Sequence, residues 1–231
     1  IMSVNVNTVY SRVLAILNKE QRGFLTPQEF NLFANQAQMD IFEQYFYDIN
    51  QFGRLHGNDT EFSDMLNILN EKIAPFIKEG TTTFTNGGFP HPTDFYRLGN
   101  IRVGTVKAQK LNRNEFLLVN SAPLTAPSNS FPVFYENEKG FVVHASAPNP
   151  QQSGVTIDYI RKPATASWVG TNVNGVPLYD ANTSTNFELH NSEETELVIK
   201  ILELAGMLTK QMDVTQYAGQ KDAQGVQQEK T

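Results

Sequence analysis

The sequence lacks cysteine and is poor in charged residues. None of its 231 residues is a cysteine, which excludes disulfide bonds, thiolate metal sites and a cysteine nucleophile. Charged residues make up 18% of the chain, below the roughly 25% of an average soluble protein, so we expect a surface rich in neutral polar groups. No apolar run approaches the roughly 18 residues of a membrane-spanning helix, and the first residues lack the basic and apolar segments of a signal peptide. We therefore expect neither a membrane span nor a secretion signal.

The balance of charge is acidic. Eighteen lysine and arginine residues against 24 aspartate and glutamate residues give a formal net charge of −6. A dedicated nucleic-acid binder usually has a basic patch and a pI above roughly 9, so this class is disfavoured. Hydrophobic residues make up 40% of the chain and aromatic residues 11%, which predicts a folded protein. A chain of this length can bury a large core without a metal or a disulfide.

Three helices are predicted in the first 79 residues. The first spans residues 4–18, where apolar residues recur at steps of three and four. The second begins at a capping box, in which Thr26 and Glu29 can satisfy each other's backbone N–H groups and Pro27 occupies the first helical position. Its apolar stripe continues for about seven turns. The third helix spans residues 61–76.

The second helix carries more aromatic side chains than one contact face needs. Phe42, Phe46 and Tyr47 widen the apolar stripe. A stripe of this width is covered on more than one side, by neighbouring helices or by another subunit. The candidate subunit contacts are Phe42, Tyr45, Phe46 and Tyr47.

Strand-like sequence replaces helical sequence near Gly80. Prolines recur through the middle of the chain and exclude long helices there. β-branched and aromatic runs predict strands at residues 81–85, 101–106, 132–136, 141–144 and 155–161. Turns are predicted at Asn86-Gly87 and at residues 137–140, and a short helix is predicted at residues 112–119.

Helical sequence returns after Asn191. Ser192 can cap a helix, and the glutamates that follow place negative charge at its start. Apolar residues then recur at helical spacing over residues 197–212. Residues 214–230 are polar on nearly all sides, which predicts a helix that is frayed alone or ordered by a partner.

None of the histidines forms a recognisable metal or catalytic motif. The four are His56, His91, His144 and His190, and no two have the spacing of a helical zinc site. His91 lies near Asp94, so a metal or acid–base role is one interpretation and an exposed turn residue is the other. His144 lies on a predicted strand, where we expect a packing role. The sequence also lacks a glycine-rich phosphate loop and the nucleophile elbow of hydrolases, so we predict no enzymatic activity and no cofactor.

Two further features allow opposed interpretations. Trp168, the only tryptophan, can anchor a loop over the core or stack on a sugar. Basic residues recur between positions 97 and 113, where surface ion pairs are one interpretation and contact with a polyanion is the other. These residues are Arg97, Arg102, Lys107, Lys110 and Arg113.

Four stretches, taken in order, resemble a known family. They are residues 23–31 (GFLTPQEFN), 89–98 (FPHPTDFYRL), 157–163 (IDYIRKP) and 187–194 (FELHNSEE). Trp168 follows the third stretch, and a long helix and Val214-Thr215-Gln216-Tyr217 follow the fourth. This order is similar to that of head–tail connector proteins of short-tailed bacteriophages, also called ring, adaptor or tail tubular proteins. Among these, it looks closest to virion proteins of crAss-like phages.

The resemblance implies an α+β fold. The N-terminal helices of residues 1–79 and the C-terminal helix and tail segment of residues 191–231 would form a bundle. A β-rich domain, sandwich-like or barrel-like, would be inserted between them at residues 80–190.

The resemblance also implies a structural role in the virion. Copies of the chain, assembled in the cytoplasm of the bacterial host, would form a homo-oligomeric ring at the phage neck, commonly twelve-fold. The ring would bind the portal and other ring or tail proteins, and DNA would pass through its channel without specific contacts. By position, the portal would bind the C-terminal segment, whose candidate contacts are Val214, Gln216, Tyr217 and Val226.

Two alternative functions remain. One is another structural part of the virion, such as a tail terminator, a minor capsid protein or a spike base. The other is a carbohydrate-active module that uses Trp168 and surface carboxylates.

Overall fold

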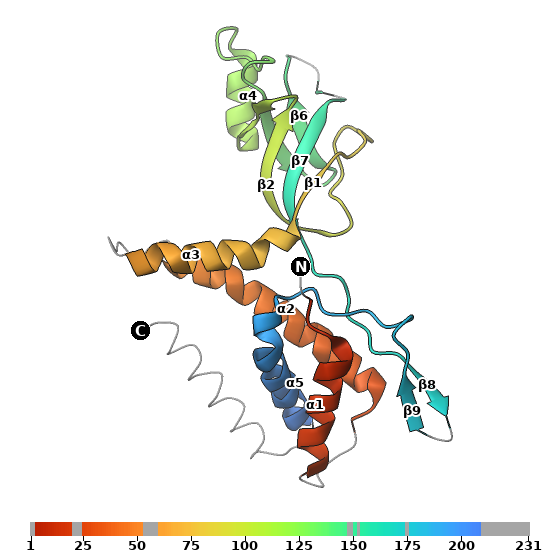
Figure 1. Cartoon of the computed structure of the whole chain (residues 1–231). Coiled ribbons are helices and arrows are strands. Elements are labelled where there is room, and N and C mark those ends of the chain that lie inside the picture. The colour runs from red at the N-terminus through yellow and green to blue at the C-terminus, as the bar shows by residue number, and fades with distance from the viewer. Residues whose placement is uncertain are drawn as a thin grey trace. The chain divides into compact units, whose positions relative to one another are not determined.

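The computed structural model divides the chain into two compact units. The described residues are 3–19, 25–52, 60–146, 150–151, 153–173 and 176–208. The helical unit combines Ile1–Pro75 with Pro163–Thr231, and the β lobe comprises Phe76–Lys162. Figure 1 shows the elements of both units.

Four α-helices in the described residues build the helical unit. They are α1 (Val6–Lys19), α2 (Pro27–Phe52), α3 (Thr60–Ile73) and α5 (Glu194–Leu208). Short 3-10 helices follow α3 (η1, Ala74–Phe76) and precede α5 (η2, Asn191–Glu193). α2 contacts both α3 and α5, and α1 contacts α5. The N-terminal helices and the C-terminal helix therefore pack as one bundle, which confirms this part of the predicted α+β fold.

The predicted capping box fixes the start of α2. The backbone N–H of Thr26 donates to Glu29 Oε2 over 2.9 Å, and the backbone N–H of Glu29 donates to Thr26 Oγ1 over 3.2 Å. The bond from the Thr26 N–H, together with one from the Thr26 hydroxyl to the same carboxylate oxygen over 2.8 Å, holds the pKa of Glu29 below its ordinary value. The two capping-box bonds also satisfy two N–H groups that the first turn of a helix leaves unpaired.

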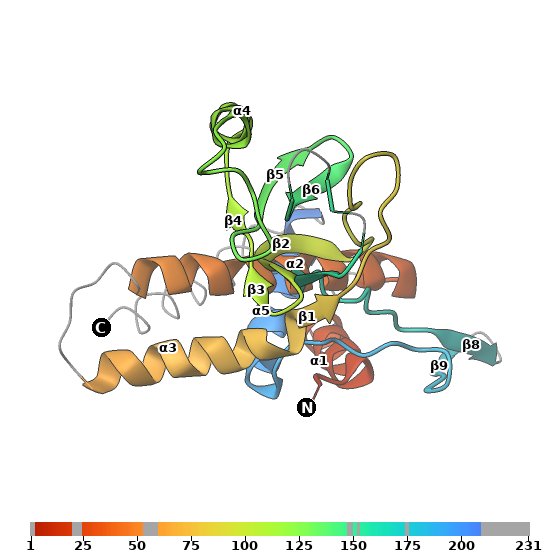
Figure 2. The same cartoon turned by 90° about the horizontal axis from the view of Figure 1, so that it is seen from above.

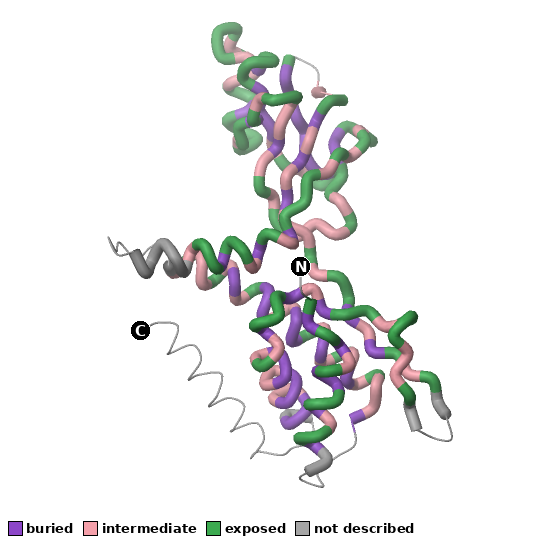
Figure 3. The backbone as a smooth tube through the Cα atoms, viewed as in Figure 1, coloured by how far each residue is buried: buried purple, intermediate pink, exposed green. Residues whose placement is uncertain are grey.

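The inner faces of three helices form the core of the helical unit. The buried side chains include Val9 and Val13 from α1, Phe30, Ala34 and Ile41 from α2, and Leu197 and Ile201 from α5. The rings of Tyr10 and Phe30 pack edge to face, with centroids 4.9 Å apart. Figure 3 shows the buried positions recurring along these helices, as the apolar periodicity of the sequence predicts.

Three amide side chains of α2 hold an extended segment against the helix. The amides belong to Asn31, Asn35 and Gln38. Asn35 accepts from the N–H of Ala166 over 2.8 Å and donates to the carbonyl of Ala166 over 2.9 Å. Asn31 makes the same two bonds with the backbone of Trp168, over 2.7 and 2.9 Å. The Gln38 amide donates to the carbonyl of Ala164 over 2.8 Å. This amide ladder acts as a partner strand, because alternate residues of an extended chain face the same way.

The extended segment leads into a two-stranded hairpin, β8 (Gly170–Val173) and β9 (Val176–Tyr179). The hairpin extends away from the helices of its unit in both views (Figures 1 and 2). Ser167, before β8, and Thr185, after β9, exchange backbone hydrogen bonds of 3.0 and 2.8 Å. The inserted lobe therefore ends at Lys162, whereas the sequence places its end at residue 190. The difference arises because the amide ladder attaches the segment after Lys162 to α2.

The described residues of the β lobe form two sheets. The first is antiparallel, in the order β1 (Ile77–Gly80), β7 (Val155–Arg161), β2 (Phe95–Val103) and β3 (Val106–Lys107). The second has the order β4 (Gln109–Lys110), β5 (Val133–Asn137) and β6 (Gly140–His144). Helix α4 (Arg113–Ser121) lies between β4 and β5 in the chain, and Glu115 accepts from the N–H of Asn112 at its start over 2.9 Å.

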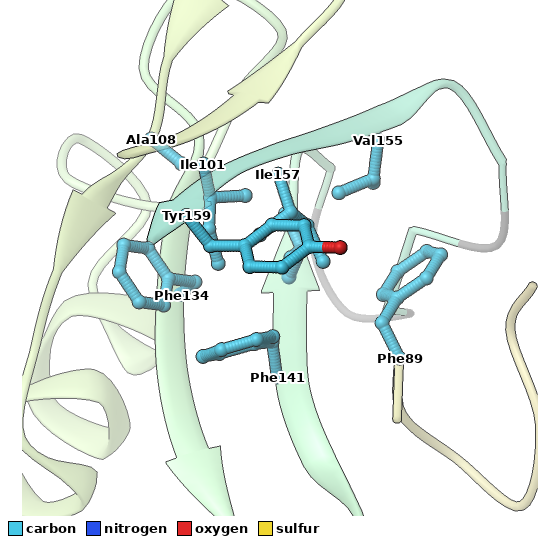
Figure 4. Packing of buried hydrophobic residues seen from close by; sticks show 9 residues of the cluster. Phe89, Ile101, Ala108, Phe134, Phe141, Val155, Ile157 and Tyr159 are labelled. Carbon is cyan, nitrogen blue, oxygen red and sulfur yellow. The ribbon is translucent and has the colours of Figure 1, made fainter. Parts of the chain in front are cut away.

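Both sheets contribute side chains to one hydrophobic core. Ile101 and Ile157 come from the first sheet, and Phe134 and Phe141 come from the second (Figure 4). The shared core makes the lobe sandwich-like. The strands of the described residues do not close into a barrel, so the barrel-like alternative is wrong.

The prediction of a strand at residues 81–85 is wrong, because the strand is β1 and it ends at Gly80. The turn that follows is confirmed: Asn86 and Gly87 have φ angles of 53° and 90°. Thr85 and Gly88 close this turn with backbone hydrogen bonds of 2.9 and 3.1 Å. The threonine run has strand chemistry, but strand identity depends on a pairing partner.

Candidate interaction surfaces

The four aromatic candidates of α2 lie on different faces. Phe42 is 0% exposed and Tyr45 is 3% exposed, so both belong to the core of the chain itself. Tyr47 is 55% exposed, and Phe46 is half-buried with its ring 5.1 Å from that of Phe42. Phe42 and Tyr45 therefore cannot contact another subunit in this fold. Phe46 and Tyr47 remain predicted subunit contacts. Periodicity finds apolar positions but does not say which neighbour covers them.

A second apolar stripe runs along α2. Leu32, Met39 and Phe46 recur at steps of seven residues, close to two helical turns, and therefore lie on one side. Ile41 follows Leu32 by nine residues, or two and a half turns, so the buried face is opposite. Leu32 is 69% exposed, and Met39 and Phe46 are half-buried. We call Leu32, Met39 and Phe46, with the adjacent Tyr47, the outer stripe.

An ion pair with a buried carboxylate links α3 to η2, the turn before α5. Lys72 Nζ lies 2.7 Å from Glu193 Oε1, and the Glu193 side chain is 6% exposed. Burial alone would raise the pKa of Glu193, but the hydrogen bond and charge of Lys72, together with side-chain hydrogen bonds with Glu196 and Ser192, hold this pKa below its ordinary value. Lys72 Nζ also lies over the ring of Tyr45, 5.6 Å from its centroid. Burial and the charge of Glu193 both raise the pKa of the Tyr45 hydroxyl.

The cap before α5 differs from the sequence prediction. His190, not Ser192, is the cap of η2, and its ring nitrogen accepts from the backbone N–H of Ser192 over 3.3 Å. Glu193 is buried in the ion pair with Lys72. The short 3-10 turn shifts the start of α5 to Glu194.

Trp168 is an anchor of the helical unit. It is 3% exposed, its ring centroid lies 4.3 Å from that of Tyr10, and its indole N–H donates to Asn7 Oδ1 over 3.0 Å. A buried indole does not offer a face to a sugar. The anchoring interpretation is confirmed, and the carbohydrate interpretation loses its aromatic platform.

His91 and Asp94 engage different partners. The ring of His91 packs on Phe141, with centroids 4.4 Å apart. Asp94 accepts from Lys78 Nζ over 2.9 Å and from the Tyr159 hydroxyl over 2.8 Å. The bond from Lys78 holds the pKa of Asp94 below its ordinary value. Within the described residues, no group of three or more histidine or carboxylate side chains could hold a metal ion.

The other histidines are structural or lie outside the described part. His144 is 5% exposed, and its ring packs 4.5 Å from that of Phe116. The packing role predicted for His144 is therefore confirmed. His56 lies outside the described residues.

Two of the predicted basic residues make ion pairs inside the β lobe. Arg102 binds both carboxylate oxygens of Asp158, over 2.9 and 3.1 Å. Lys110 Nζ lies 3.0 Å from Glu136 Oε1. These carboxylates neutralise the cations, which favours the ion-pair interpretation over a polyanion contact.

The β lobe exposes apolar side chains in and after α4. Leu117 and Leu118 on α4 are 57% and 72% exposed, and Leu124 and Phe131 in the following loop are 100% and 76% exposed. Several large exposed apolar residues in one segment are typical of an interaction site. Apolar periodicity did not predict this exposure, because α4 buries only Phe116 and its periodic signal is therefore weak. The adjacent leucines were the available signal, because a helix that packs on one face can bury at most one of two neighbouring residues and here buries neither.

The four C-terminal candidates, Val214, Gln216, Tyr217 and Val226, lie outside the described residues. Among the described helices, none combines the length and the apolar character that crossing a bilayer requires. No model of a known protein family matches the chain, and a search of curated proteins finds no significantly similar sequence.

Proposed function

We propose that this protein is a structural subunit of a phage neck, in which copies assemble into a ring between the portal and the tail. One observation carries the proposal: α5 packs on α1 and α2, so the two ends of the described chain form one bundle, and the β lobe is inserted between them in the chain. This is the architecture that the four resembling stretches imply. The proposed location is the virion, and the proposed partners are further copies, the portal and neighbouring tail proteins.

The outer stripe of α2 supports the proposal. A helix that is apolar on its core side and again on the opposite side has more apolar surface than its own bundle needs. Leu32 and Tyr47 are 69% and 55% exposed, which suits a contact with a neighbouring copy. A ring requires two different complementary patches on each subunit, and the outer stripe is our candidate for one of them.

The charge of the chain also supports the proposal. A channel through which DNA slides must not hold phosphates with many lysine and arginine contacts. The net charge of −6 and the low charged fraction of 18% meet this requirement. The side chains of Arg102 and Lys110 are already paired with carboxylates.

The test is assembly of the full chain. We would measure particle mass by native mass spectrometry and light scattering, for the chain alone and after mixing with the purified portal protein of the same phage. We expect a closed multimer under at least one of these conditions, and we expect the chain among the proteins of purified virions. A monomer in both conditions, together with absence from virions, would overturn the proposal.

A substitution in the outer stripe sharpens this test. Leu32→Glu should reduce the multimer fraction at least tenfold, because it places a charge in the proposed contact. Leu32→Met keeps an apolar side chain and should assemble like the unmodified chain. Circular dichroism of both variants controls for folding.

A further inference from the structure

Strands β1 and β7 separate after four residue pairs, and a cavity opens between their continuations. Their last pair is Gly80 with Ile157. Continuing this register would place residues 81–84 opposite residues 156–153, but residues 81–84 make no backbone-to-backbone hydrogen bond within the described residues. A cavity of about 480 Å³ lies there, lined by both segments and Gly104. We call it the β1–β7 gap; its volume falls within the roughly 300–1,000 Å³ usual for ligand pockets.

The backbone of β7 presents hydrogen-bonding groups to the β1–β7 gap. The carbonyl of Gly154 accepts from the N–H of Gly104 over 3.1 Å, on the side of β2. Backbone groups of successive residues in a strand point to alternating sides, so Val155 directs its N–H and C=O toward the β1 side. Thr82 would be opposite Val155 if the register continued. Unpaired backbone groups along a strand edge are a template for an added strand.

The side chains around the β1–β7 gap are neutral. None of the lining residues is charged, and most carry hydroxyl groups: Thr81, Thr82, Thr83, Ser153 and Thr156. Thr82 Oγ1 is buried and has no hydrogen-bond partner within the described residues. A buried hydroxyl without a partner is costly, and a rotation of the Thr82 side chain that turns the hydroxyl toward an occupant of the gap would remove this cost.

We propose that the β1–β7 gap binds an extended, uncharged peptide segment of a partner protein, which pairs with β7 at Val155 as an added strand. Backbone hydrogen bonds would provide affinity without demanding one sequence. The hydroxyl lining would select small polar and β-branched side chains, because a charged side chain would lose its hydration without gaining a counter-charge. This proposal concerns the β lobe alone and does not depend on ring assembly.

The test uses the full chain and a synthetic probe, acetyl-Thr-Val-Thr-Val-Thr-amide. Hydrogen exchange followed by NMR should show a rapidly exchanging Val155 amide in the protein alone. Saturating probe should slow this exchange at least tenfold. The matched control is the same peptide N-methylated at all five residues, which removes the residue N–H donors of both edges and should leave the exchange rate unchanged.

A cross-link provides the complementary test. Because the chain has no cysteine, the only disulfide that Thr82→Cys with Val155→Cys can form within one chain is the one that closes the gap, and non-reducing electrophoresis separates this monomer from chains cross-linked to each other. The oxidised variant should not bind the probe, and its reduced form should bind it. If the variant does not fold or does not cross-link, the exchange experiment on the unmodified chain decides. No protection by the probe, equal protection by the N-methylated control, or slow exchange of Val155 without any peptide would each overturn the proposal.

Discussion

The helical unit and the β lobe both have an apolar core, but they differ in the polar side chains that join their distant segments. Buried polar groups join distant segments of the helical unit, through the amide ladder and through the Lys72–Glu193 ion pair. The core of the β lobe is aromatic and aliphatic, and its ion pairs, such as Arg102 with Asp158, are partly exposed. Directional side-chain hydrogen bonds therefore add to the apolar core of the helical unit, whereas the side chains that join the two sheets of the β lobe are mainly apolar.

The largest effect should come from the core of the β lobe. Phe141 is fully buried between the two sheets, and Phe141→Ala should lower the free energy of unfolding by about 3–5 kcal/mol through lost burial and a cavity. Urea unfolding would measure the loss, and hydrogen exchange would locate it in β6 and β7. Phe131→Ala is the matched control, since Phe131 is 76% exposed and should change stability little. Equal losses in both variants would contradict the assigned core.

A smaller effect should come from the amide ladder. Asn35→Ala leaves the N–H and C=O of the buried Ala166 without their partners and should cost about 2 kcal/mol. The loss should expose amides of residues 164–168 and leave the β lobe unchanged, which hydrogen exchange can measure. Gln36→Ala, at an exposed neighbouring position, is the control. If both variants were equally stable, the ladder would not hold the segment.

The smallest effect should be the acid sensitivity of the Lys72–Glu193 pair. Because the pKa of Glu193 is lower in the folded chain than in the unfolded chain, the pair stabilises the helical unit at neutral pH. This contribution should disappear as the pH falls below about 4. Burial opposes the ion pair, which keeps the effect small.

Urea unfolding between pH 3 and pH 7 would measure this dependence. Glu193→Gln should reduce the slope of stability against pH, and Lys72→Gln should reduce it similarly. An unchanged slope in Glu193→Gln would show that other carboxylates cause the acid sensitivity.

Local features follow from the sequence alone. The capping box of Thr26 and Glu29, the turn at Asn86-Gly87 and the limits of β7 agree with prediction, because each depends on residues close together in the chain. The acidic balance and the absence of cysteine are also fixed by composition. These features establish helical ends and a strand-rich middle, and therefore the α+β class.

The tertiary structure alone decided which segments and faces meet. Asn31 and Trp168 are 137 residues apart in the chain, so no local pattern indicates that the helix binds the segment after the β lobe. The burial of Phe42 and Tyr45, and the exposure of Tyr47, depend on where α3 and α5 pack. The end of β1 at Gly80 likewise depends on its partner β7, because a strand exists only where another strand pairs with it. Sequence periodicity determines which side chains are apolar, and only long-range contacts determine what covers them.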